Sequence, residues 1–232
     1  MKNLRPNLGS KVLSTENQIE KLNSVILATD VADSPLPWGF ESGTDFTDMY
    51  SNYEELNTTY NEGKQLAKKQ TEHKNTYQSE IRKCLQEISQ YIKVNNDTFY
   101  EELRLYGFEV INSTNGIIKI PNEGALIENL CQCVLDKHNA DGSSSFINSF
   151  DMVGLQSNLD SMQSASSIAK QATLDWRHVA IEKSDTLQDL TTMRKLIGRE
   201  MLRNPNVETR DMETWGFVGT EYIKPRDTEA AA

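Results

Sequence analysis

The sequence predicts a mainly α-helical protein in which a three-helix unit occurs twice, giving an elongated bundle. Three observations support this prediction. Apolar residues recur at helical spacing over long stretches of the chain. The Tyr-Gly-Phe run at residues 106–108 returns as Trp-Gly-Phe at residues 215–217. Apolar residues that precede the first run also precede the second in the same order, so each unit should hold a capped helix, a loop and a long helical hairpin.

Composition limits the class of protein. A chain of 232 residues with 37% hydrophobic content can bury the core of one large domain or two small ones. The 34 acidic residues outnumber the 24 basic ones, and the net charge of -10 argues against direct binding to nucleic acid. Cys84, Cys131 and Cys133 are an odd number of thiols, which argues against a disulfide framework. We find no signal peptide and no apolar run of membrane-spanning length, so we expect a soluble protein without membrane contact.

The composition along the chain suggests five segments. Both ends are polar, and such segments bury too little apolar surface to fold unaided. The predicted segments are an N-terminal arm at residues 1–13, a first helical unit at 14–110, a linker at 111–121, a second helical unit at 122–218 and a C-terminal tail at 219–232.

The first helix of the first unit has recognisable start and stop signals. Thr15 and Gln18 have the spacing of a capping box, in which each side chain satisfies a free backbone amide. Apolar residues at helical spacing continue to about Thr29. Pro35 and Pro37 then prevent continuation, which predicts a loop.

A long helical stretch should begin after Thr44. Its apolar and small residues alternate by four and three positions, which is typical of a narrow coiled-coil seam. Polar residues 75–78 offer a second capping box, and we therefore expect a hairpin of two antiparallel helices. One uninterrupted helix is the alternative, because no Gly or Pro forces a turn at this point. The expected seam residues are Met49, Tyr53, Leu56, Tyr60, Gly63 and Ala67 before the turn and Tyr77, Ile81, Cys84, Leu85, Ile88 and Ile92 after it.

The first unit should end in three steps. Asn-Asn-Asp at residues 95–97 stops the long helix, and a short helical turn follows through Leu103. Gly107 should then adopt the left-handed conformation that terminates helices, with aromatic residues sealing the end of the bundle. In the linker, residues 112–116 have turn chemistry and residues 117–120 should be extended.

The expectation of an internal repeat rests on residues that match between the two halves of the sequence. Single matches could arise by chance, but their common order indicates duplication. We expect the Pro-containing loop to be longer in the first copy and the hairpin to be longer in the second. The matches are Ile19 with Ile127, Leu22 with Leu130, Ile26 with Val134, Met49 with Met152, Leu56 with Leu159, Ile81 with Leu190, Cys84 with Met193, Ile88 with Ile197 and Ile92 with Met201.

The sequence indicates no catalytic, cofactor-binding or metal-ligating residue. The segment 136–142 contains His138 between acidic residues, but it lacks the ligand spacing of a calcium loop and is better explained as a polar helix exit. Cys131 and Cys133 lack the spacing of a zinc site; we expect one to face the core and the other the solvent. His73 and His178 lie in polar sequence. Interhelical packing is the favoured interpretation of Tyr50, Tyr53, Tyr60, Tyr77 and Tyr91, with ligand stacking as the alternative.

A capped helix, a Ser-Pro-Leu loop at residues 34–36, a long helical stretch and a closing Gly-Phe form a recognisable order. This order resembles duplicated helical-bundle proteins of Bacteroidetes and their tailed phages over residues 14–110 and 122–218. In the second copy, Ser-Ser-Phe at residues 144–146 replaces the Ser-Pro-Leu run, which departs from the pattern. The resemblance implies a structural or assembly component rather than an enzyme.

The leading functional hypothesis is a non-enzymatic virion protein, such as a ring, connector or tail-assembly subunit. Its expected partners are other structural proteins and further copies of the same chain. The alternative is a bacterial or viral adaptor module, located in the cytoplasm, that holds a partner helix in a bundle groove. An enzyme with a site scattered along the chain is a third hypothesis.

Overall fold

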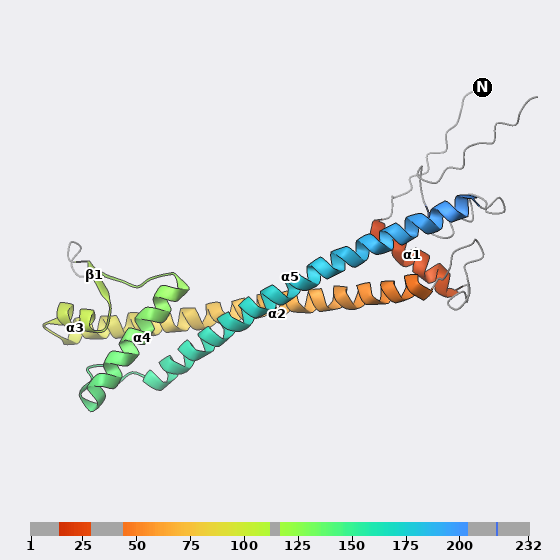
Figure 1. Cartoon of the computed structure of the whole chain (residues 1–232). Helices are drawn as coiled ribbons and strands as arrows, with labels where there is room; N and C mark the ends of the chain where they lie inside the picture. Colours follow the sequence, from red (N-terminus) through yellow and green to blue (C-terminus); the bar gives the residue numbers. More distant parts are fainter. Residues whose placement is uncertain (1–13, 29–43, 112–116, 204–216, 218–232) are drawn as a thin grey trace, which may run out of the picture. The chain divides into compact units, whose positions relative to one another are not determined.

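The computed structural model describes residues 14–28, 44–111, 117–203 and 217. This part of the chain is mainly α-helical, as predicted (Figure 1). A short helix is followed by a helix of 52 residues in each half of the sequence. The elements in order are α1 (Thr15–Ala28), α2 (Thr44–Asn95), α3 (Phe99–Leu105), β1 (Glu109–Ile111), β2 (Ile117–Lys119), α4 (Gly124–Asp141), the 3-10 helix η2 (Gly142–Ser144) and α5 (Met152–Arg203).

Polar side chains cap the starts of two helices. The Ser14 hydroxyl accepts a hydrogen bond of 3.3 Å from the amide of Asn17 at the start of α1. The cap is therefore Ser14 and the expected Thr15 is wrong, because Thr15 is already the first helical residue. At the start of α5, a carboxylate oxygen of Asp151 accepts a 2.8 Å hydrogen bond from the amide of Gly154.

Each long stretch is one uninterrupted helix, and the expected hairpin turns are wrong. The hydroxyl of Thr76 does not cap a new helix but donates to the carbonyl of Glu72, one turn earlier, at 3.1 Å. With no Gly or Pro at this point, the backbone continues as a helix to Asn95. The helices α2 and α5 have equal lengths of 52 residues, so the expected extra length in the second copy is also wrong.

The predicted helix stops lie where the sequence places them. The side-chain oxygen of Asn96 accepts a 2.8 Å hydrogen bond from the amide of Thr98 directly after α2. At the end of α3, Gly107 has a φ of 86°, the left-handed region that favours glycine. The amide of Gly107 donates to the carbonyl of Arg104, and the amide of Phe108 donates to the carbonyl of Leu103, at 3.0 Å and 2.9 Å. This pair of bonds is the Schellman pattern that ends many helices.

The extended piece predicted at residues 117–120 exists as β2. It pairs with β1 in a two-stranded antiparallel sheet, in which Val110 lies opposite Ile118. The strand β1 was not predicted, because its pairing with β2 is a contact that no local sequence pattern shows.

The chain divides into two compact units, and the division falls inside both long helices. Unit 1 contains α1, residues 44–61 of α2, residues 176–203 of α5 and Phe217. Its hydrophobic core therefore joins the start of α2 to the end of α5. The buried core residues of unit 1 are Ile19, Leu22, Ile26, Phe46, Tyr53, Leu190, Ile197, Met201 and Phe217.

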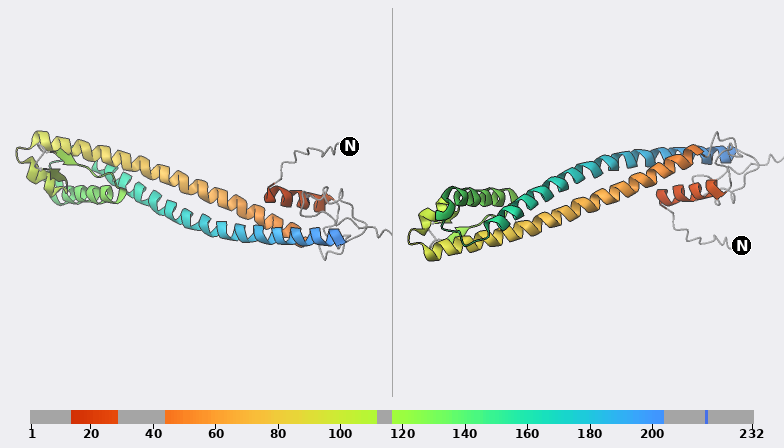
Figure 2. Two further views of the ribbon diagram at one scale, coloured as in Figure 1. Left: turned by 90° about the horizontal axis from the view of Figure 1, so that it is seen from above. Right: turned by 90° about the horizontal axis from the view of Figure 1, so that it is seen from below.

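Unit 2 spans residues 62–175 and holds the remaining elements. In this unit α4 lies alongside the end of α2 and the start of α5 (Figure 2). The side chains of Tyr106 and Phe108 are buried in this core, which confirms that aromatic residues seal the end of α3. The helical residues that build the core are Ile81, Leu85, Ile88 and Ile92 of α2, Ile127, Leu130, Cys131, Val134 and Leu135 of α4, and Met152, Leu155, Leu159 and Met162 of α5.

Buried positions recur at one constant separation in sequence between the two long helices. The same separation links the buried side chains of Phe108 and Phe217. A separation shorter by one residue links the buried residues of α1 to those of α4: Ile19 to Ile127, Leu22 to Leu130 and Ile26 to Val134. The buried pairs in α2 and α5 are Phe46 and Leu155, Tyr53 and Met162, Ile81 and Leu190, Leu85 and Arg194, Ile88 and Ile197, and Ile92 and Met201.

Several sequence predictions fall outside the described residues. These are the arm at residues 1–13, the loop around residues 34–36, the turn at residues 112–116, Trp215 with Gly216, and the tail at residues 219–232.

We expect Gly107→Ala to reduce the free energy of unfolding by about 1–3 kcal/mol. Alanine at this positive φ is strained, and its Cβ would lie 2.9 Å from the Cβ of Cys133. The measurement is urea unfolding of Gly107→Ala in the wild type and in a Cys133→Gly background. The loss should be smaller in the second background, because the contacting atom is gone. Gly142→Ala is the control, because the φ of Gly142 is also positive, at 55°, but a Cβ there would meet nothing within 4 Å. The free energy of unfolding lost on Gly142→Ala should therefore be equal in the wild type and in the Cys133→Gly background. Equal losses for Gly107→Ala would contradict the close contact.

Candidate functional site

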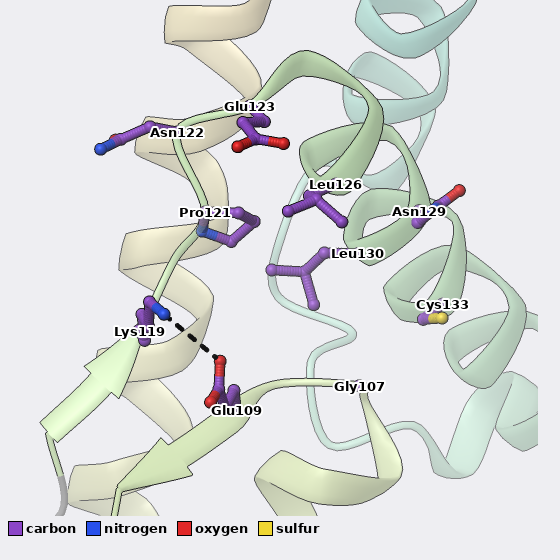
Figure 3. A pocket seen from close by; sticks show the side chains of 10 residues that line it. All are labelled: Gly107, Glu109, Lys119, Pro121, Asn122, Glu123, Leu126, Asn129, Leu130 and Cys133. Atoms are coloured by element: carbon purple, nitrogen blue, oxygen red, sulfur yellow. Dashed lines mark ion pairs between the residues drawn. The ribbon is translucent and has the colours of Figure 1, made fainter.

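An open groove of unit 2 lies between the β-hairpin and α4 (Figure 3). It has a volume of about 450 Å³ and is open to solvent. Its apolar floor comes from Pro121, Leu126 and Leu130, while its rim is polar. The lining residues are Gly107, Glu109, Lys119, Pro121, Asn122, Glu123, Leu126, Asn129, Leu130 and Cys133.

Three local features hold the walls of this groove in place. The left-handed turn at Gly107 brings the end of α3 against Leu130 and Cys133 of α4. Pairing of β1 with β2 then directs the chain toward Pro121. The side-chain amide of Gln78 donates a 2.9 Å hydrogen bond to the carbonyl of Asn122, which ties the segment before α4 to α2.

Two opposite charges face each other across the hairpin at the groove. The ammonium of Lys119 lies 3.9 Å from a carboxylate oxygen of Glu109 across the hairpin (Figure 3). Both side chains are largely exposed, and exposed ion pairs contribute little stability, so each charge is available to a bound partner. Leu126 has 50% of its surface exposed, which is unusual for a large aliphatic side chain at the floor of a groove. An apolar floor with a charged rim is the usual composition of a protein-binding surface.

A hydrogen-bonded chain of Tyr106, Ser145 and His138 lies close to the end of α4. The Ser145 hydroxyl is 2.8 Å from His138 Nδ1 and 3.3 Å from the Tyr106 hydroxyl. A serine beside a histidine is the arrangement used in nucleophilic catalysis, which normally adds a carboxylate to orient the histidine. Here the third member is tyrosine, and Ser145 is only 6% exposed. The chain of hydrogen bonds therefore ties η2 to the end of α3 and has a structural role.

This hydrogen-bonded group was not predicted from the sequence, because Tyr106 and Ser145 are 39 residues apart. Near His138 the sequence predicted a polar helix exit, and this is confirmed: α4 ends at Asp141 and the amide of Gly142 donates to the carbonyl of His138. Lys137 and Asp141 form a 2.6 Å ion pair on the last turn of the helix. The hydrogen bond to Asp141 raises the pKa of Lys137, which stays charged.

The cysteines behave as the sequence reading predicted. Cys131 is buried, and burial raises the pKa of its thiol to about 12. Cys133, two residues later on α4, is exposed at the groove. Cys84 packs partly buried against the core, and burial also raises the pKa of its thiol. Within the described ranges, no group of three or more His, Cys, Asp or Glu side chains could hold a metal ion.

Interhelical packing is confirmed for Tyr53 and Tyr60 of the expected set. The Tyr60 ring meets Trp176 edge-on, with ring centroids 5.7 Å apart. Tyr91 packs against Phe146 and Phe150 at 5.6 Å and 5.3 Å. The hydroxyl of Tyr53 donates a 2.6 Å hydrogen bond to Glu16 of α1, and burial with this bond raises the pKa of Tyr53 above its usual value. Tyr53 and Tyr60 therefore join helices, whereas Tyr91 packs against the segment between η2 and α5.

We expect one fast-reacting thiol per folded chain. Alkylation by iodoacetamide near neutral pH should modify Cys133, whereas Cys84 and Cys131 should react only after unfolding, because the thiolate is the reactive form. Peptide mapping by mass spectrometry identifies the modified residue in each state. Equal labelling of Cys131 and Cys133 in the native protein would show that α4 does not pack as described.

No helix among the described residues is both long enough and apolar enough to cross a membrane. No protein-family model, curated protein or solved structure matches this chain. The functional interpretation therefore depends on the groove, the paired long helices and the surfaces that they present.

Proposed function

We propose that this protein is a non-enzymatic structural or assembly component, such as a ring, connector or tail-assembly subunit of a phage virion. The observation that carries the proposal is the pair of equally long helices, whose two ends are fixed in separate hydrophobic cores. A pair of long, uninterrupted helices is a regular and continuous element, which suits a spacer or scaffold. The described residues also present an open groove with a charged rim, which could contact another protein.

We further propose that the chain is a tandem duplication. The repeated element is a short helix, a long uninterrupted helix and a closing aromatic residue. Support comes from the equal lengths of α2 and α5 and from the buried positions that recur between them at one separation. In this proposal each core combines the short helix and the first part of the long helix from one copy with the last part of the long helix from the other.

The arms at residues 1–13 and 219–232 lie outside the described residues. We propose that they contact neighbouring copies or other proteins of the same particle. Polar segments of this kind cannot offset the backbone ordering cost of roughly 1–2 kcal/mol per residue without added contacts. The proposed anchors are the apolar residues Leu8, Val12, Tyr222 and Ile223.

The second candidate function is an adaptor module, and the groove beside α4 favours it. Its open apolar floor and charged rim would accept an apolar segment of one partner protein without any assembly of identical copies.

Mass in solution separates the two functions. Light scattering coupled to size-exclusion chromatography should give a mass several times the 26.3 kDa of one chain if the protein is a ring or connector subunit. Deletion of residues 1–13 or 219–232 should reduce that mass, because the proposed contacts are lost. A monomer whose mass is unchanged by both deletions would support the adaptor instead. Detection of the chain in purified particles would add an independent test of the virion role.

The duplication predicts the behaviour of the two halves when they are separated. Fragments 14–110 and 122–218 each carry only part of both hydrophobic cores, because each core joins residues from both halves of the sequence. An equimolar mixture should form a heterodimer that melts at a higher temperature than either fragment, as measured by circular dichroism. Two fragments that fold cooperatively as monomers, with no gain on mixing, would contradict the proposal.

A further inference from the structure

A hollow on unit 2 lies between α2 and α5, apart from the groove beside α4. It has a volume of about 500 Å³ and is open to solvent. Small side chains and the stems of two lysines form most of its lining. The lining residues are Thr71, Lys74, Ser166, Ala169, Lys170, Thr173 and Leu174.

In unit 1, aromatic side chains fill the corresponding space between α2 and α5. There, Tyr60 meets Trp176, and the ammonium of Lys183 lies 5.2 Å from the centroid of the Tyr60 ring. The same ammonium lies 5.5 Å from the centroid of the Tyr53 ring and donates a 2.8 Å hydrogen bond to Asn57. Unit 1 therefore contains a lysine in contact with aromatic rings between the two long helices.

The constant separation between α2 and α5 identifies the counterparts of these residues in unit 2. Lys183 corresponds to Lys74, and Asn57 corresponds to Ser166. Tyr60 corresponds to Ala169 and Trp176 to Ala67, so a methyl group stands where each of these two rings stands in unit 1. The lysine is retained and the two rings are absent. Lys74 and Ala169 both line the hollow, whereas Ala67 is buried and does not. The hollow therefore lies where Ala169 stands in place of the Tyr60 ring.

The chemistry of the hollow is apolar and cationic. The hydroxyls of Thr71 and Thr173 donate to backbone carbonyls one turn earlier, at 2.8 Å and 2.7 Å, and so are already bonded within their own helices. Leu174 has 54% of its surface exposed at the edge. Lys74 and Lys170 both line the hollow, and no acidic residue does. Two ammonium groups here contrast with the net charge of -10 for the whole chain.

We propose that this hollow binds an aromatic side chain of a partner protein that carries a carboxylate next to the ring. The ring would occupy the space that Tyr60 fills in unit 1, against the stem of Lys74, whose ammonium lies beside Gly124 at the start of α4. The carboxylate would lie near Lys170 at the exposed edge. The internal counterpart in unit 1 specifies the ring, and the two lysines specify the negative charge. The inference does not depend on whether the chain assembles into a particle.

The probe is N-acetyl-L-tyrosine, which joins one aromatic ring to one carboxylate. Titration into the full-length ¹⁵N-labelled protein should cause saturable shifts of the amide signals of Thr71, Lys74, Ser166 and Ala169. N-acetyl-L-tyrosinamide lacks the carboxylate and N-acetyl-L-leucine lacks the ring, so both should bind more weakly. Absence of shifts at these residues, or equal binding of the leucine compound, would overturn the proposal.

Two matched variants test the position of the ring. Ala169→Tyr places in unit 2 the residue that unit 1 has, and it should abolish the shifts by filling the hollow from within. Tyr60→Ala is the converse change, and it should create a second saturable site reported by the amides of Asn57 and Lys183. Circular dichroism confirms that each variant is folded. Undiminished binding to folded Ala169→Tyr would contradict the assigned position.

A third variant tests the charge without altering the packing. Lys170 is exposed, so Lys170→Gln should leave the fold intact while weakening binding of N-acetyl-L-tyrosine by about two- to fivefold, the range for an exposed ion pair. Binding of the tyrosinamide should be unchanged. Equal effects on both compounds would remove the carboxylate from the proposal.

Discussion

Each hydrophobic core depends on contact between α2 and α5, which come from different halves of the sequence. In unit 1 the numbering along one helix rises while that along the other falls: Tyr53 lies near Lys183, and Tyr60 lies near Trp176. The pair is therefore antiparallel. A single helix has no hydrophobic core of its own, so neither long helix could bury its apolar stripe without the other. Short helices add the third side of each core, α1 in unit 1 and α4 in unit 2.

The sizes of the side chains between α2 and α5 determine where the space between these helices is filled and where it is open. In unit 1, tyrosine and tryptophan rings close the space between the helices, and their contacts include the Tyr53 hydrogen bond to α1. Buried positions of unit 2 include Ala67, Ala165 and Ala172, which let the helices approach but fill little volume. Under the proposed duplication, Ala169 stands in unit 2 at the position that Tyr60 has in unit 1, and Ala169 lines the hollow. The duplication would thus give one unit a packed aromatic layer and the other an open surface.

Local signals in the sequence predicted most helix ends but not the continuity of the long helices. Asn96 and Gly107 act through bonds within a few residues, so their roles could be read directly. Thr76 could cap a new helix or bond to the preceding turn, and the local sequence allows both. The choice depends on packing against α5, and contacts over such a distance are absent from a local pattern. Equivalent burial of Ile81 and Leu190 was visible as a sequence match, because both positions keep a large aliphatic side chain.

The groove beside α4 and the chain of Tyr106, Ser145 and His138 were beyond prediction for the same reason. The groove joins the hairpin to α4, and the hydrogen-bonded chain joins the end of α3 to His138 of α4 through Ser145, so neither shows a local sequence pattern. Where such a group includes serine and histidine, the exposure of the serine hydroxyl decides whether the group could act in catalysis. Attack on a substrate requires an accessible hydroxyl, and Ser145 is only 6% exposed. The groove beside α4 is open, and its lining holds Cys133 and Lys119 but no histidine to activate a nucleophile. Its apolar floor and charged rim are the features on which the proposed adaptor role rests.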